Sequence, residues 1–185
     1  TLMRRIAVIG TTGSGKTTLA RQLAQRLGAP FVEEDALAWG PNWTMAPRDV
    51  LRQRIADALS GTAWVVDGNM FSLGHPNLQM ADTVVWLDLP LSVILWRLVW
   101  RSVRRIARRE ELWRGNRERW RTAFFSRESL LWYALRTFRA RRRAYTALFA
   151  QAEYAHLRVV RLRSERAARA WLCGIAEPAL RRGSW

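Results

Sequence analysis

Short apolar runs alternate with longer segments of helical periodicity along most of the chain. Strand-like runs rich in β-branched residues occur at 5–9, 30–34, 63–67, 83–88 and 158–162. Between them, apolar residues recur every three or four positions at 16–27, 47–60, 91–108, 126–150 and 164–176. Strands that alternate with helices are typical of a parallel sheet with helices on both faces, so the pattern predicts an α/β fold.

The length and composition indicate one globular domain. A chain of 185 residues can form one substantial core but is short for two, so we expect a single domain over 1–185. The longest apolar run, 84–96, contains an aspartate and a proline and is too short to cross a bilayer. The chain shows no signal-peptide pattern, and its one cysteine, Cys173, has no zinc-ligand spacing with His75 or His156. We therefore expect a cytoplasmic protein without a cysteine–histidine metal site.

The segment after the first predicted strand combines glycines with the only lysine of the chain. Gly10, Gly15, Lys16 and Thr17 occupy the fixed positions of the pattern G-x-x-x-x-G-K-[ST], with a strand before it and a helix after it. In such a loop, backbone N–H groups curl around phosphate oxygens, and the helix N-terminus adds its positive end. Lys16 is predicted to reach the β- and γ-phosphates, and Thr17 to bind Mg²⁺. The residues expected to bind ATP here are Gly10, Thr11, Thr12, Gly13, Ser14, Gly15, Lys16, Thr17 and Thr18.

The third predicted strand ends in an acidic residue, which narrows the class of nucleotide-binding protein. The run 63–67 ends in Asp67, which can hold Mg²⁺ through water, but no glutamate follows it to activate a water molecule. The guanine-specificity motif N-K-x-D is excluded, because Lys16 is the only lysine. These features favour phosphoryl transfer to a small molecule over work driven by nucleotide hydrolysis.

Four stretches resemble the P-loop kinases of the adenylate-kinase-like superfamily. Within that group the chain is most similar to the bacterial adenylate-kinase-related and FlaR-type DNA topology modulation proteins. The stretches follow one another in the family's order, at residues 9–18, 35–43, 64–69 and 81–90. The resemblance implies a three-layer sandwich with a five-stranded parallel sheet of order 2-3-1-4-5. It also implies a monomer with an arginine-rich helical lid inserted at about 97–125.

The resemblance places the phosphoryl-acceptor pocket after the second strand. Asp35 is the candidate base for an acceptor hydroxyl, Trp39 and Trp43 could stack on a flat substrate, and Arg48 could bind an acceptor phosphate. The alternatives are that Asp35 caps the following helix, that the tryptophans belong to the core, and that Arg48 is a solvated surface residue. The predicted substrate-binding residues are Asp35, Trp39, Trp43, Arg48, Asp67 and Asn69.

Positive charge is concentrated in the second half of the chain. The chain has 31 basic and 15 acidic residues, a net charge of +16, and residues 97–143 supply 16 arginines and four glutamates. Arg97 and Arg101 lie one helical turn apart, and the resemblance implies that they clamp the transferring phosphoryl group. It also implies that Arg163 lies near the adenine of ATP. The candidate catalytic residues are thus Lys16, Asp35, Arg97 and Arg101.

The same region contains two helices that are expected to carry apolar stripes. In the first, the stripe consists of Trp96, Val99, Val103 and Ile106. In the second, it consists of Leu130, Leu131, Trp132, Leu135, Phe138, Tyr145 and Phe149, which we expect in the core.

Two hypotheses of function follow. The favoured one is a kinase that transfers the γ-phosphoryl group of Mg-ATP to a nucleoside monophosphate or a hydroxylated small molecule. The alternative is a nucleotide-dependent regulatory or nucleic-acid-binding protein that uses the basic face 97–143. The missing glutamate after Asp67 and the lack of a recognisable nucleic-acid motif favour the kinase.

Overall fold

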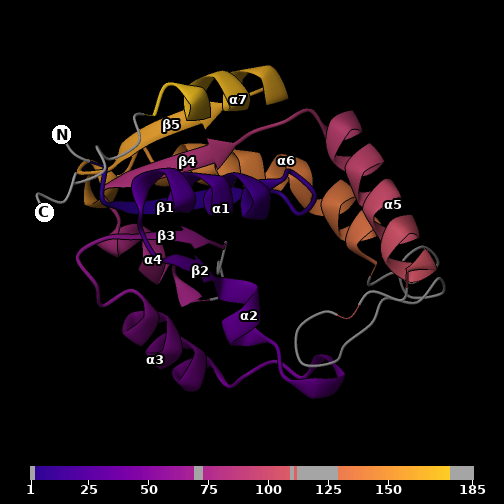
Figure 1. Ribbon diagram of the computed structural model, residues 1–185, viewed down its shortest axis with the longest axis horizontal. Coiled ribbons are helices and arrows are strands. Elements are labelled where there is room, and N and C mark those ends of the chain that lie inside the picture. Colours follow the sequence, from indigo (N-terminus) through magenta and orange to yellow (C-terminus); the bar gives the residue numbers. More distant parts are fainter. Residues whose placement is uncertain (1–2, 69–72, 109–110, 112–128, 176–185) are drawn as a thin grey trace, which may run out of the picture.

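The sheet has the predicted order. The computed structural model describes residues 3–68, 73–108, 111 and 129–175, and its five strands are all parallel in the order β2-β3-β1-β4-β5 (Figure 1). The interior strands are apolar on both sides because helices cover both faces of the sheet. The strands are β1 (Arg5–Gly10), β2 (Phe31–Glu33), β3 (Trp64–Asp67), β4 (Thr83–Leu87) and β5 (Arg158–Leu162).

Five long helices correspond to the five predicted ones. They are α1 (Lys16–Leu27), α3 (Arg48–Ala58), α5 (Leu91–Ala107), α6 (Leu130–Leu148) and α7 (Glu165–Cys173). Within the described residues, four short elements were not predicted, since three to five residues are too few to show a helical period. They are α2 (Glu34–Ala38), α4 (Pro76–Met80) and the 3₁₀ turns η1 (Pro41–Trp43) and η5 (Ala152–Tyr154). The described part of the chain forms the three layers of the expected α/β sandwich.

Each face of the sheet has its own core. On one face, Leu23 of α1 and Leu172 of α7 pack against strand residues such as Val8. On the other face, Ile55 of α3 and Tyr145 of α6 belong to a second cluster, together with Leu78 of α4. Alternate residues of one strand serve opposite faces, which fixes the register of the sheet.

The stripe predicted for α5 does not coincide with the buried side of the helix: Val99, Val103 and Ile106 are half-buried, and Trp96 is exposed. Trp96 and Trp100 are 69% and 63% exposed, and their rings stack on each other with centroids 6.3 Å apart. The buried side of α5 is formed by Ile94 and Leu98 with Ser102. A helix with apolar residues around most of its circumference leaves its buried side undetermined, and here packing of α5 against α6 decides it.

The stripe predicted for α6 is correct only in part. Tyr145 is buried as expected, but Trp132 and Leu135 are half exposed, and Ala134 takes the buried position against Leu98. A small alanine allows α5 and α6 to approach closely, which the search for large apolar residues could not detect. Among the described residues, no helix combines the length and the hydropathy needed to cross a membrane.

The register brings the candidate residues to one edge of the sheet. Asp67 at the end of β3 pairs with Val8 of β1 on one side and with Glu33 of β2 on the other, while Gly10 pairs with Leu87 of β4. The carboxyl ends of all these strands therefore meet where β1 turns into α1. In an open parallel sheet this edge is where ligands bind.

Candidate functional site

The phosphate loop between β1 and α1 is shaped by two glycines with left-handed backbone angles. Gly13 has φ 81° and Gly15, which precedes α1, has φ 91°. A β-carbon at residue 13 would lie 2.6 Å from Cγ of Leu98, and one at residue 15 would lie 2.9 Å from Nη1 of Arg97. The loop thus needs glycine both for its backbone angles and for the close approach of α5. The loop leads into the start of α1, where backbone N–H groups without helical partners can bind an anion, so the phosphate site stays a prediction that this geometry supports.

Three polar side chains meet beside this loop. The hydroxyl of Thr17 donates a hydrogen bond to Oδ2 of Asp67, and Nζ of Lys16 lies 3.6 Å from Oδ1 of the same carboxylate. Asp67 is almost fully buried. The predicted pair of Thr17 and Asp67 is therefore brought together with the only lysine of the chain.

This arrangement fits a magnesium ion that is bound together with a nucleotide. The buried Oδ1 of Asp67 makes no hydrogen bond to the described residues, so a polar atom of an ion's hydration shell could satisfy it. In the described part of the chain, no group of three or more His, Cys, Asp and Glu side chains is placed to hold a metal ion. Mg²⁺ commonly binds through one or two protein oxygens plus phosphates and water, and Thr17 and Asp67 provide such a pair.

Asp35 lies on the first turn of α2 and lines the same cleft. Burial raises the pKa of its carboxyl above the ordinary value, the nearby cations Lys16 and Arg101 oppose that shift, and the Asp67 carboxylate adds to it. Asp35 is not the residue that caps α2, since that position belongs to Glu33. The structure thus brings four predicted residues, Lys16, Asp35, Asp67 and Arg101, into electrostatic contact.

Glu34 is a buried acid that the sequence analysis did not single out. It is fully buried in α2, and a β-carbon at residue 68 would overlap its carboxyl group, so Gly68 is required for this approach. Glu34 also contributes to the raised pKa of Tyr145 in α6, although burial of the phenol is the main cause. The acidic cluster 33–35 was visible in the sequence, but which member would turn inward depended on the start of α2.

The two tryptophans after α2 line the cleft. Trp39 and Trp43 form an edge-to-face pair with ring centroids 5.7 Å apart. Trp39 packs partly against the core, whereas Trp43 is 40% exposed and does not belong to it. Trp39 therefore belongs partly to the core, and its stacking on a substrate stays a prediction. Together the two rings form an aromatic wall of the cleft.

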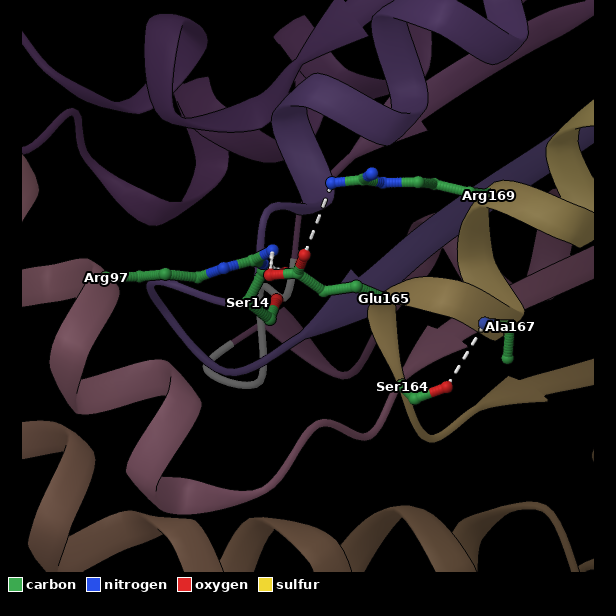
Figure 2. A network of polar contacts seen from close by, with 6 residues as sticks. All are labelled: Ser14, Arg97, Ser164, Glu165, Ala167 and Arg169. Carbon is green, nitrogen blue, oxygen red and sulfur yellow. Dashed lines mark hydrogen bonds and ion pairs between the residues drawn. The ribbon is translucent and has the colours of Figure 1, made fainter.

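Arg97 and Arg101 both line the cleft from α5, as their spacing predicted. Figure 2 shows Arg97 reaching from α5 to the phosphate loop, where Nη1 donates a hydrogen bond of 2.7 Å to the carbonyl oxygen of Ser14. Its Nη2 forms an ion pair with Glu165 on the first turn of α7, and Arg169 contacts the other oxygen of that carboxylate. Glu165 was not predicted, and only its place just after the fifth strand could have drawn attention to it.

The remaining predicted residues lie elsewhere. Arg48 and Arg163 are exposed and are not among the residues that line the cleft. Asn69 and most of the predicted lid at 97–125 lie outside the described residues. Conversely, Tyr133 and Arg141 of α6 line the cleft although no motif marked them, and the Arg141 guanidinium lies over the Tyr133 ring, 5.0 Å from its centroid.

The phosphate loop, Asp35, the two tryptophans and the arginines of α5 line one large cleft with a volume of about 1910 Å³. It runs from Asp35 and the two tryptophans, past the phosphate loop, to the residues of α7 that include Ala168 and Leu172. A single small ligand typically fills a pocket of about 300–1,000 Å³, so this cleft has room for a nucleotide and a second molecule side by side.

The chain is similar to known proteins over part of its length. A family model described as an AAA domain matches residues 5–65, which include β1, the phosphate loop and α1. A shikimate kinase of Ruegeria pomeroyi is 33% identical over 113 residues, 53% of this chain and 57% of that protein. A shikimate kinase of Thermosynechococcus vestitus is 35% identical over 107 residues, 50% of this chain and 58% of that protein. The matched region spans little more than half the length of these curated relatives.

Solved structures match over almost the whole chain. A shikimate kinase from Bacteroides thetaiotaomicron superposes with a TM-score of 0.56 over 93% of this chain and 96% of its own, at 16% sequence identity. A gluconokinase from Sinorhizobium meliloti gives a TM-score of 0.50 over 94% of both chains, at 22% identity. At such identities the likeness shows the fold, which is that of the P-loop kinases.

Proposed function

We propose that this protein is a phosphotransferase that moves the γ-phosphoryl group of Mg-ATP to a hydroxyl group of a small acceptor. The observation that carries the proposal is the cluster of Lys16, Asp35 and Arg101 in one cleft, with the buried Asp67 next to Lys16. Cations that stabilise a phosphoryl group and a carboxylate that accepts a proton are the two requirements of this chemistry. The curated relatives, named shikimate kinases, are of the same reaction class.

Asp35 acts as the general base in this proposal. Its carboxylate takes the proton of the acceptor hydroxyl while the hydroxyl oxygen forms a bond to the γ-phosphorus. The bond between that phosphorus and the β,γ-bridging oxygen breaks, and ADP leaves with the electron pair. A carboxyl with a raised pKa is a stronger base than an ordinary aspartate, which suits this role.

Lys16 and Arg101 stabilise the charge on the phosphoryl group during transfer. The Lys16 ammonium is held near the phosphate loop by Asp67, and Arg101 lies close enough to Asp35 to lower its pKa. Both cations therefore act on the charge of the proposed base, and Lys16 also belongs to the donor loop. Thr17 and Asp67 are the residues that would hold Mg²⁺, which when bound neutralises charge on the β- and γ-phosphates.

A hydroxylated small molecule is the acceptor class that we favour over a nucleoside monophosphate. Arg48, the residue expected to bind an acceptor phosphate, is exposed and outside the cleft lining. The relatives named shikimate kinases also support a hydroxyl acceptor. In this proposal Trp39 and Trp43 form the wall against which the acceptor packs. The protein works as a monomer in the cytoplasm. Its function is most similar to that of the adenylate-kinase-related and FlaR-type proteins.

The alternative, a regulator that binds nucleic acid through the face 97–143, leaves part of the site unexplained. A polyanion would be attracted by the arginines of α5 and α6, but it would need neither a buried Asp35 nor its approach to Lys16. Weak binding of nucleic acid at low salt is expected from the charge alone.

A phosphoryl-transfer screen tests the proposal. The protein is incubated with Mg-ATP and two pools, hydroxylated metabolites including shikimate and nucleoside monophosphates, and products are detected by a mass gain of one phosphate. We expect a product from the first pool, formed at least about 10²-fold more slowly by the variant Asp35→Asn. Bound ATP without any phosphorylated product, or with release of inorganic phosphate only, would contradict the proposal and favour the regulator.

A further inference from the structure

The two arginines of α5 that line the cleft have different neighbours. Arg101 lines the same cleft as Asp35, and its charge opposes the effect of burial on that carboxyl. Arg97, one turn earlier, has both ends of its guanidinium engaged by the phosphate loop and α7. To reach a phosphoryl group in transit beside Asp35, Arg97 would have to leave the Ser14 carbonyl and the Glu165 carboxylate.

The position of Arg97 in the cleft assigns it to the nucleotide donor. If phosphates occupy the loop and the acceptor lies by Asp35, the nucleoside part of the donor must extend the other way, toward α7. Arg97 spans that boundary, because it touches Ser14 in the loop and Glu165 on α7 (Figure 2). Its guanidinium also lies against Gly15, where no side chain separates it from the loop.

Glu165 projects from a capped first turn of α7 toward Arg97. Ser164 caps α7 by accepting a hydrogen bond from the Ala167 N–H, and this cap fixes the first turn from which Glu165 projects (Figure 2). A carboxylate on the first turn of a helix is stabilised by the helix dipole. Arginine has many rotamers, and anchoring both ends of its fork removes them before the ligand arrives.

We propose that Glu165 is a positioning residue for the donor nucleotide: it holds Arg97 across the phosphate loop, where the guanidinium binds the donor, and of the two arginines only Arg101 joins Lys16 in stabilising the transferred phosphoryl group. The inference rests on the proposed function for the identity of the donor, Mg-ATP. It revises the expectation that Arg97 and Arg101 form one clamp.

The test compares three variants in two measurements. Binding of Mg-ATP is measured by calorimetry, and kcat is measured at saturating ATP with the acceptor found in the screen. Glu165→Gln and Arg97→Met should each weaken ATP binding by about tenfold, with kcat within about twofold of wild type. Arg101→Met should leave ATP affinity within about threefold but lower kcat by about 10²-fold or more.

A double variant separates positioning from a general structural effect. In the Arg97→Met background, Glu165→Gln should cause no further loss of ATP affinity, because Glu165 acts through Arg97. Two matched controls remove other ion-pair partners in the cleft: Arg169→Ala, the outer partner of Glu165, and Glu33→Gln, the partner of Arg21. Both controls should bind ATP like wild type.

Three results would overturn the inference. They are unchanged ATP affinity in Glu165→Gln, additive losses in the double variant, and a loss of kcat in Arg97→Met equal to that in Arg101→Met. The measurement of ATP binding does not depend on catalysis. A wild-type protein that binds Mg-ATP but phosphorylates nothing would refute the proposed function, while the comparison of Glu165→Gln with Arg97→Met would still decide this inference.

Discussion

The phosphate loop and the acceptor side of the cleft are built in opposite ways. The loop is one continuous segment, residues 10–18, and it uses backbone groups whose placement is set by glycines and by the start of α1. The acceptor side brings together α2, η1, α5 and α6, whose residues are far apart in the sequence. Recognition by backbone groups can be encoded locally, whereas recognition by side chains depends on the whole fold.

The two regions also differ in how much change they can accept. Around the loop, a β-carbon on Gly10 would meet Leu87, and one on Gly13 would meet Leu98. On the acceptor side, Trp43 is partly exposed, and a wide cleft separates it from α6. A fold of this kind can keep its donor site and change its acceptor through substitutions at the open side.

The largest effect is expected from Lys16→Met. Lys16 serves both the bound donor and the phosphoryl group in transit, so we expect kcat/KM to fall by about 10⁴-fold and stabilisation by Mg-ATP to be lost. The far-UV spectrum and the melting curve without nucleotide should change little. An unfolded variant would contradict the assignment of Lys16 to the phosphate loop and would erase the distinction between the two regions.

Asp35→Asn is the matching change on the acceptor side. We expect kcat to fall by about 10²- to 10⁴-fold, with the affinity for Mg-ATP nearly unchanged. Because burial raises the pKa of Asp35, its ionised form costs stability at neutral pH. The variant should therefore melt at a slightly higher temperature than wild type at pH 7, and a clear decrease would show that Asp35 stabilises the fold.

The same carboxyl predicts how activity and stability depend on pH. A base works only when deprotonated, so activity should be lost as pH falls through the raised pKa of Asp35, above the ordinary value of 3.8. Its contribution to stability has the opposite sign: it becomes unfavourable as pH rises from 3.8 through that raised pKa. A profile of kcat/KM against pH measures the loss of activity on the acid side. A midpoint of that loss at or below 3.8 would exclude Asp35 as the base.

Packing around the loop can be tested with two glycines. Gly13→Ala should lower the free energy of unfolding by about 2–5 kcal/mol, because it adds both a strained backbone angle and a clash with Leu98. Gly74→Ala is the matched control, since Gly74 has φ 75° but no atom of the described residues lies within 4 Å of the added carbon. Gly74→Ala should lower the free energy of unfolding in urea by about 1–2 kcal/mol. If both variants lose the same amount, α5 moves easily to make room for the added methyl group.

The smallest effect is expected from Trp43→Ala. Loss of one partly exposed ring should raise the KM for the acceptor by about three- to tenfold and leave ATP binding unchanged. Trp100→Ala, which removes an exposed ring outside the cleft lining, should change neither. If ATP affinity falls in Trp43→Ala, the division of the cleft into two sides is wrong.

The fold could be predicted almost completely from the sequence. The strand ends were correct to within a residue, because parallel strands buried on both faces form short apolar runs. The phosphate loop was also predictable, since Gly10, Gly15, Lys16 and Thr17 are neighbours in the chain. What failed was the orientation of α5 and α6, because Trp96 and Trp132 are as apolar as any core residue and only packing decided that they are exposed.

The candidate site was predictable only where it follows a strand. Asp35 and Asp67 come directly after β2 and at the end of β3, and the sheet brings such positions to one edge. Glu165, Tyr133 and Arg141 lie on helices whose rotation relative to the cleft has no local signal. The place of Glu165 depends on its contact with Arg97, far earlier in the chain, and the places of Tyr133 and Arg141 depend on the packing of α6 against α5.

Lys16 also has a consequence for how occupancy of the site can be observed. It is the only lysine of the chain, and its side chain lies at the wall of the cleft, 14% exposed beside Asp67. An amine-reactive reagent therefore has one side chain to modify, and a bound triphosphate should shield it. The fraction of labelled Lys16, read by peptide mass, would report which nucleotides enter the loop before any acceptor is known.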